Sequence, residues 1–188
     1  MVIWLQGGPG SSSLYGLFEV NGPISAVFET GSPGPTTGTL NPHSWHKVAN
    51  VIYIDNPVGT GFSFSEAKGH PSTQSQVADG LHEFLIQFFK LFPAYRQNDF
   101  YAFGESYAGK WVPTICKRIH DMNQISETKI NLVGLGIGNG WTAPENQSIY
   151  ADFLYQVLYY VPCIMCNICP SSLFHPILGR YGRWHDSH

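Results

Sequence analysis

The chain is most informative at Phe100-Tyr-Ala-Phe-Gly-Glu-Ser106-Tyr-Ala-Gly109. The aromatic, β-prone run up to Phe103 predicts a strand, and a helical pattern begins just after Ser106. A serine on a sharp turn between a strand and a helix holds its hydroxyl clear of the backbone, where a base can take its proton and a carbonyl can approach. The small residues around Ser106 allow the backbone to pack that tightly. The stretch therefore predicts a nucleophilic serine at position 106.

Three further apolar runs also end in turn residues: Val2–Leu5, Val51–Ile54 and Leu132–Ile137. Continuous apolar runs of this length are typical of strands that are buried on both faces. Residues 29–46 are rich in Gly, Pro and Thr and predict an excursion on the surface.

A helix is predicted on each side of the Ser106 strand. The first has one apolar face at spacings of three and four: Val77, Leu81, Phe84, Leu85, Phe88 and Phe92. We expect Ser72 or Thr73 to cap its start and Pro93 to mark its end. The second presents Val112, Ile115, Ile119 and Met122 inward, and its Pro113 falls in the first two turns, where proline is tolerated. Strands that alternate with helices of this length predict an α/β fold with a parallel sheet.

Composition excludes several classes of function. The 188 residues are 43% hydrophobic, enough for one domain with a core, and carry a net charge of −3 without a basic cluster. Nucleic acid and anionic membranes are therefore not expected partners. No apolar run reaches the about 18 residues of a membrane helix, and no signal peptide is recognised, because the chain starts in a core strand. Cys163, Cys166 and Cys169 lack a fourth ligand at suitable spacing, so neither a metal nor another cofactor is predicted.

Acyl transfer also needs donors for the oxyanion. In a strand–serine–helix site one donor is the backbone N–H of the next residue, here Tyr107, and the other comes from the loop after an earlier strand. Gly7-Gly8-Pro9-Gly10 follows the Val2–Leu5 run, and glycine lets backbone amides approach a ligand closely. The alternative interpretation is a tight turn in which glycine serves geometry alone.

Four motifs, in this order, resemble the serine carboxypeptidase family and its vitellogenic-like members. They are Trp4-Leu-Gln-Gly-Gly-Pro-Gly10, Asp55-Asn-Pro-Val-Gly-Thr-Gly-Phe-Ser63, Gly104-Glu-Ser-Tyr-Ala-Gly-Lys-Trp-Val-Pro113 and Ile137-Gly-Asn-Gly140. The resemblance covers residues 1–157 and implies a partial α/β-hydrolase domain, a parallel sheet with flanking helices. It implies that Ser106 is the nucleophile, and that the amides of Gly8 and Tyr107 form the oxyanion hole. The implied reaction releases the C-terminal residue of peptides through an acyl-enzyme, in a lysosome, a vacuole or the secretory route.

The resemblance also implies how the C-terminus of a peptide substrate is recognised. Gln6, Gly7 and Glu105 match the amide, the glycine and the acid of the family's carboxylate site. The family has a second Glu two residues before Gly-Pro, where this chain has Val20, and Glu19 is displaced by one position, about 100° on a helix. Two neighbouring carboxyl groups share a proton more readily, so an acidic optimum is expected.

The family's order is Ser, then Asp, then His on later strands, and no strand pattern precedes the tail candidates Asp152, Asp186, His175, His185 and His188. The chain is therefore expected to be a fragment with little activity by itself, and residues 158–188 to be a divergent, poorly ordered tail. Two alternatives stay open: a non-catalytic truncated product, and an acyltransferase of the same scaffold. Glu105 favours the peptidase, because the acyltransferases tend to carry Asp at that position. A dinucleotide loop at residues 134–140 fails, because Asn139 takes the place of the third glycine. The sequence gives no oligomeric state.

Overall fold

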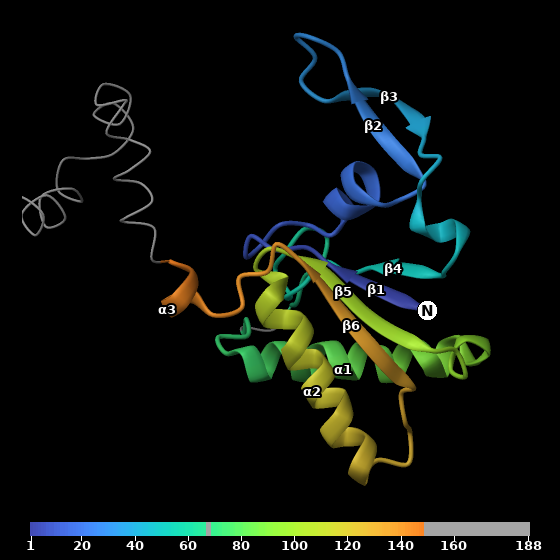
Figure 1. The fold of residues 1–188 in the computed structure, drawn as a ribbon, viewed down its shortest axis with the longest axis vertical. Helices are drawn as coiled ribbons and strands as arrows, with labels where there is room; N and C mark the ends of the chain where they lie inside the picture. Colours follow the sequence, from blue (N-terminus) through green and yellow to red (C-terminus); the bar gives the residue numbers. More distant parts are fainter. Residues whose placement is uncertain (67–68, 149–188) are drawn as a thin grey trace, which may run out of the picture. The chain divides into compact units, whose positions relative to one another are not determined.

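The computed structural model describes residues 1–66 and 69–148. They contain a four-stranded parallel sheet (Figure 1). In the order of their pairing, the strands are β4 (Val51–Tyr53), β1 (Val2–Leu5), β5 (Phe100–Glu105) and β6 (Leu132–Gly138). Each predicted apolar run is one of these strands, so the predicted parallel sheet is confirmed. β1 pairs Leu5 with Gly104 of β5, which places the first motif directly beside the Ser106 turn.

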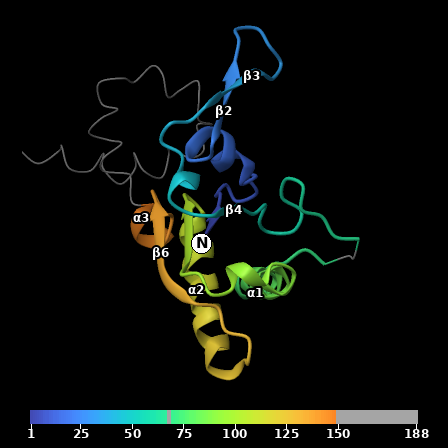
Figure 2. The ribbon, with the colours of Figure 1, turned by 90° about the vertical axis from the view of Figure 1, so that its right-hand side faces the viewer.

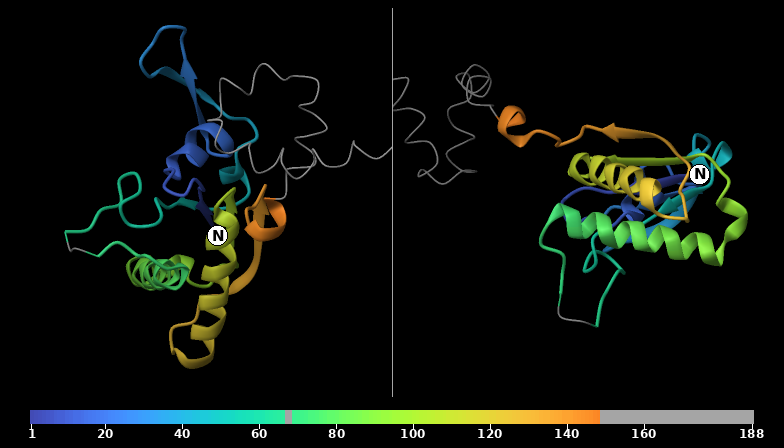
Figure 3. Two further views of the ribbon diagram at one scale, coloured as in Figure 1. Left: turned by 90° about the vertical axis from the view of Figure 1, so that its left-hand side faces the viewer. Right: turned by 90° about the horizontal axis from the view of Figure 1, so that it is seen from below.

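Two long helices, α1 (Gln74–Leu91) and α2 (Ala108–Ile125), cover one face of this sheet (Figures 2 and 3). Their buried side chains share one core with alternate residues of the strands. The core residues of α1, α2, β1 and β5 that have no exposed surface are Ile3, Leu5, Leu85, Ala102, Ala108, Val112, Ile115 and Ile119. Because this core lies directly under the ends of β1 and β5, those ends are held on a packed support.

The first helix begins and ends as predicted. Thr73 is the N-cap of α1: its hydroxyl accepts a hydrogen bond from the Gln76 N–H at 3.2 Å, and the Gln76 side chain returns to the Thr73 N–H. The predicted inward face is wrong at two positions, since Phe84 and Phe92 stay 39% and 49% exposed while Phe89 is buried. The buried stripe repeats every four residues, from Val77 and Leu81 through Leu85 to Phe89, so Phe84 and Phe92 lie at its edge.

The second helix also follows the prediction for its inner face. Val112, Ile115 and Ile119 of α2 are fully buried, and Met122 is half-buried near the end of the helix. Pro113 lies inside α2, within its first two turns.

On the other face of the sheet lie the short π-helix η1 (Gly16–Val20), the 3₁₀ turn η2 (Trp45–Lys47) and a hairpin of β2 (Ile24–Phe28) and β3 (Pro35–Leu40) (Figure 1). The predicted surface excursion over 29–46 contains β3, a strand that the sequence analysis missed. All six residues of β3 are exposed, so it lacks the apolar run that identified the other strands. Its three threonines favour an extended backbone, but Pro35 and Gly38 hide that preference in the sequence.

Two compact units divide the chain, Met1–Thr142 and a second that begins at Ala143. The first also holds the 3₁₀ turn η3 (Pro93–Tyr95), and α3 (Pro144–Gln147) is the described element of the second. The expected boundary at 157 and the tail 158–188 lie outside the described residues. Of the helices in the described residues, none combines the length and apolarity that crossing a bilayer requires.

Candidate active site

Ser106 lies on the sharp turn that the sequence predicts. It follows the last residue of β5 directly, and α2 begins at Ala108. Its φ angle is +59°, a left-handed conformation that few residues other than glycine adopt. Three backbone hydrogen bonds hold it there: the Ser106 N–H donates to the Gly138 carbonyl at 2.9 Å, and its carbonyl accepts from Gly109 at 2.9 Å and Trp141 at 2.8 Å. Such strain persists only where the surroundings determine it, and it is typical of functional serines on this kind of turn.

The glycine loop after β1 packs directly against this turn. A Cβ atom on Gly7 would lie 2.6 Å from the Tyr107 nitrogen and 2.8 Å from the Ser106 Cβ. Only a residue without a side chain fits there, because the first of these neighbours is backbone that cannot yield. Gly8, the next residue, has φ +106°, a backbone conformation that favours glycine. The structure therefore brings the two predicted sources of oxyanion donors, Gly8 and Tyr107, into one neighbourhood.

A buried chain of hydrogen bonds connects Gln6 to the residue before the serine. The Gln6 amide Nε2 donates to Glu105 Oε2 at 3.0 Å, and its Oε1 accepts from the Trp4 indole N–H at 3.0 Å. Because the indole can only donate, it fixes which end of the amide faces Glu105. Trp4 was quoted in the first motif without a role of its own. The signal that identifies it is the alternation along β1, which puts Trp4 and Gln6 on the same face of the sheet.

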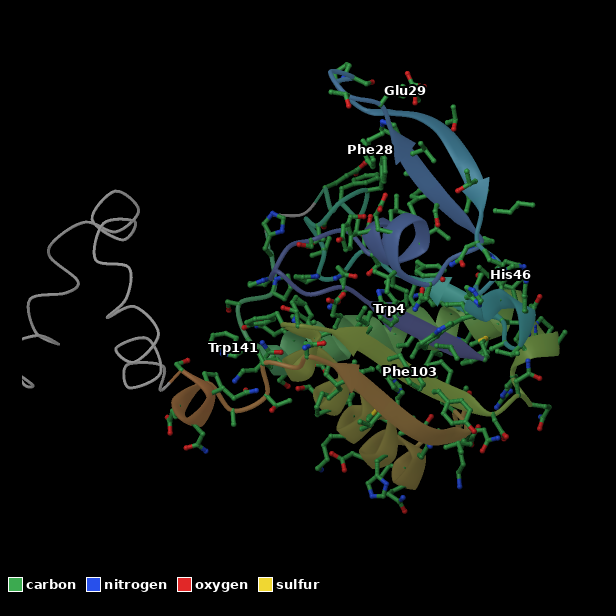
Figure 4. The ribbon with its side chains drawn as sticks, turned by 45° about the horizontal axis from the view of Figure 1, so that its top comes forward. Trp4, Phe28, Glu29, His46, Phe103 and Trp141 are labelled. Carbon is green, nitrogen blue, oxygen red and sulfur yellow. The ribbon has the colours of Figure 1, made fainter. Side chains whose placement is uncertain are left out.

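Aromatic rings support this network from the face opposite the helices. Trp4 and Phe103 come from the neighbouring strands β1 and β5 (Figure 4). Trp4 meets the edge of Trp45 with 5.6 Å between ring centroids, and Trp45 meets Phe103 at 5.2 Å. Edge-to-face pairs at these distances stabilise a fixed arrangement beyond the area that they bury. The Trp4 ring, whose indole N–H binds Gln6, is thus held by a second aromatic contact.

Glu19, the candidate second acid, is exposed on η1. The turn is a π-helix, in which the Asn21 N–H donates to the Gly16 carbonyl at 3.0 Å. Val20, at the position where the family carries its Glu, is 43% exposed. Glu105 accepts its hydrogen bond from Gln6. The role of Glu19 in carboxylate recognition stays a prediction.

The Tyr107 side chain begins a further aromatic group. Its ring lies 5.5 Å from that of Trp111 and 5.4 Å from that of Trp141, and its hydroxyl accepts from Gln74 Nε2 at 3.3 Å. Lys110 Nζ lies 5.9 Å from the centre of the Trp141 ring. These contacts hold the start of α2, and with it the Tyr107 amide, in place.

Within residues 1–66 and 69–148, no histidine hydrogen-bonds to Ser106. His82 is buried on α1, where desolvation lowers its pKa, and His46 contacts Ser44. The same described residues contain no group of three His, Cys, Asp or Glu side chains that would hold a metal. The candidate acids and histidines of the tail, and the three cysteines at 163, 166 and 169, lie outside the described residues.

Comparison with known proteins decides the family. The family model described as serine carboxypeptidase matches residues 1–164. The chain belongs to the serine carboxypeptidase family.

Several relatives in this family are similar over most of the chain. The venom serine carboxypeptidase of Apis mellifera is 49% identical over 158 residues, which are 84% of this chain and 32% of that protein. The probable serine carboxypeptidase CPVL of Homo sapiens is 47% identical over 161 residues, again 84% of this chain and 32% of the relative. The chain therefore spans about a third of the length of these curated serine carboxypeptidases.

A solved structure supports the fold. The crystal structure of Kex1Δp, a prohormone-processing carboxypeptidase from Saccharomyces cerevisiae, superimposes with a TM-score of 0.76 at 29% identity. The match covers 95% of this chain and 37% of that one. The α/β-hydrolase fold expected from the sequence, a partial parallel sheet with flanking helices, is confirmed.

Proposed function

We propose that this chain carries the nucleophile and oxyanion side of a serine-type carboxypeptidase, with Ser106 as the nucleophile. The observation that carries the proposal is the strained Ser106 turn, packed against a glycine loop that follows a neighbouring parallel strand. The distance between a Gly7 Cβ and the Tyr107 nitrogen, 2.6 Å, means that the two loops share one small volume, as an oxyanion site built from both requires.

The proposed reaction has two steps. The Ser106 hydroxyl attacks the carbonyl of the last peptide bond and gives its proton to a base, while the N–H groups of Gly8 and Tyr107 donate to the oxygen that becomes negative. The C–N bond then breaks, the amine takes up the proton, and the C-terminal amino acid leaves. Water hydrolyses the resulting ester at Ser106. The Asp and His that the resemblance implies for the base lie outside the described residues.

Gln6, Gly7 and Glu105 are proposed to bind the free carboxylate of the substrate. One N–H of the Gln6 amide is used by Glu105, which leaves the second for the substrate. A carboxylate next to Glu105 is repelled unless one of the two groups carries a proton. Binding of the peptide C-terminus is therefore expected to be strongest at acid pH.

The test is release of an amino acid from an N-blocked dipeptide at pH 5 by the complete protein that contains this chain. Ser106→Ala should lower kcat by about 10⁴-fold or more, because loss of the nucleophile removes the acyl-enzyme. A fluorophosphonate should modify Ser106, located by peptide mass spectrometry. A purified, folded and monodisperse protein that neither hydrolyses the peptide nor reacts with the probe would contradict the proposal. Products that carry the acyl group on an added alcohol instead of water would favour the acyltransferase.

We also propose that the protein follows the secretory route. Asn146-Gln-Ser148 is an acceptor sequence for N-linked glycans, and the relative from Apis mellifera is named a venom protein. Protein purified from its native source should lose mass at the Asn146 peptide on treatment with an N-glycosidase. An unmodified Asn146 together with recovery only from the cytosol would contradict this route.

A further inference from the structure

Asp55 is the first residue of the second motif, and the reaction described above gives it no part. It lies two residues after the end of β4, and its carboxylate joins two loops at the carboxyl edge of the sheet. Oδ1 accepts from the Ser13 backbone N–H at 2.7 Å and from the Ser12 hydroxyl at 2.6 Å. Both serines belong to the glycine loop that follows β1.

The other carboxylate oxygen is bound just as closely. Oδ2 accepts from the Phe62 backbone N–H at 2.8 Å. A Cβ on Gly61 would lie 2.1 Å from Oδ2, so the loop of the second motif passes directly over the carboxylate. Three hydrogen bonds from two segments therefore hold the Asp55 carboxylate in a single position.

Ser13 links the Asp55 carboxylate to the backbone of Gln6. Its side chain is 1% exposed, its hydroxyl accepts from the Gln6 backbone N–H at 3.0 Å, and the same hydroxyl donates to the Ile54 carbonyl. Asp55 therefore holds the Ser13 backbone, and Ser13 holds the backbone of Gln6, the residue before the oxyanion glycines. The turn between these points is closed by a hydrogen bond from the Ser11 N–H to the Gly7 carbonyl at 3.1 Å.

We propose that Asp55 is a positioning residue that fixes the Gln6–Gly8 backbone, and through it the oxyanion donor at Gly8. This inference rests on the proposed function, because it assigns the loop a catalytic purpose. Donors stabilise a developing oxyanion only when they are already in place before the reaction. A loop displaced by about 1 Å loses most of this advantage, at a cost near 10²-fold in rate.

The experiment compares three variants of the complete protein with wild type. Asp55→Ala removes all three contacts. Asp55→Asn keeps an oxygen for Ser12 and Ser13 but turns an NH₂ group toward the Phe62 N–H. Asp79→Asn is the matched control, since Asp79 is a surface carboxylate that binds Arg118 at 2.9 Å between α1 and α2.

For Asp55→Ala we expect kcat to fall by about 10²-fold, with a smaller rise in KM because Gln6 and Gly7 are also proposed to bind the substrate carboxylate. A peptidyl aldehyde, which forms the oxyanion at Ser106, should bind about 10²-fold more weakly, a larger loss than the rise in KM for the dipeptide substrate. Asp55→Asn should recover part of the loss, and Asp79→Asn should equal wild type. Partial unfolding would weaken the binding of every ligand by the same factor. A larger loss for the aldehyde than for the substrate therefore separates a positioning role from a loss of stability.

A second measurement does not depend on catalysis. In the complete protein, Asp55→Asn and Asp55→Ala should speed hydrogen exchange of the Gln6 amide proton, which Ser13 protects, and Asp79→Asn should leave it unchanged. If the wild-type protein neither hydrolyses peptides nor reacts with the probe, the proposed function fails and exchange at Gln6 alone decides this inference. Unchanged exchange at Gln6 overturns it, and so does an Asp55→Ala enzyme with the kcat of wild type.

Discussion

Leu5 and Leu40 are both the last residues of strands, yet their surroundings are opposite. Leu5 ends β1 and is fully buried, whereas Leu40 ends β3 and is 84% exposed. β1 pairs with a strand on each side and lies over the helical core, while β3 pairs with β2 and presents all its residues to solvent. Phe28, at the end of β2, is likewise exposed (Figure 4).

The comparison shows what an accurately placed site requires. The chain that continues from Leu5 is Gln6 and Gly7, which meet the Ser106 turn at contact distance because the pairing of Leu5 with Gly104 is fixed by the layer below. The chain that continues from Leu40 meets no such layer. Strand pairing alone fixes the direction of the chain, whereas burial against a core also fixes where the residues after the strand lie.

The largest expected effect is on the two leucines themselves. Leu5→Ala should destabilise the chain by about 2–5 kcal/mol, since it leaves a cavity between sheet and helices. Leu40→Ala, the same chemical change at the end of the exposed strand, should alter the free energy of unfolding by less than about 0.5 kcal/mol. Urea unfolding followed by tryptophan fluorescence measures both. Equal effects for the two variants would show that the hairpin is buried as well as β1.

A second pair of variants compares glycines in the two regions. Gly7→Ala places a methyl group against the backbone of Tyr107 and should cost about 1–3 kcal/mol, with a loss of hydrolysis that follows from the displaced turn. Gly34→Ala, in the hairpin loop, meets no atom within 4 Å and should change stability by less than about 1 kcal/mol. Differential scanning calorimetry measures the change in stability, and the blocked dipeptide assay measures the loss of hydrolysis. A stable, active Gly7→Ala protein would mean that the two loops are not in contact.

The smallest effect concerns pH. Burial first, and the Arg118 charge second, lower the pKa of His82 below its usual value, while Glu83 and Asp79 oppose the shift. The folded state therefore resists taking the proton that the unfolded chain accepts near its ordinary pKa of about 6.5. The contribution of neutral His82 to the free energy of unfolding is complete above a pH of about 6.5, and it is lost as the pH falls through the lower pKa of the folded state.

We expect wild-type stability to decline between pH 7 and pH 5, and His82→Asn to flatten part of that decline. Urea midpoints at several pH values measure the slopes. A slope that His82→Asn leaves unaltered would show that His82 is not shielded from water in the folded chain.

The sequence by itself determined the features whose causes are local. Continuous apolar runs identified all four strands of the parallel sheet, Pro93 and a cap at Ser72 or Thr73 marked the limits of α1, and the pattern around Ser106 predicted the strand, the turn and the helix. Propensity, capping and periodicity act over a few residues, so they are legible without a structure. The same reasoning failed at β3, where the local composition is that of a loop and only pairing with β2 makes a strand.

Tertiary structure alone decided which residues meet. The hydrogen bond from Gln6 to Glu105 joins residues 99 positions apart, and the one from Ser13 to Asp55 spans 42. Alternation along β1 puts Trp4 and Gln6 on one face, but the order of residues does not show that Gly7 must lack a side chain because Tyr107 lies against it. These relations depend on the register between parallel strands and on the core that fixes it. The sequence therefore named the chemical groups of the site, and the packed sheet determined how they are brought together.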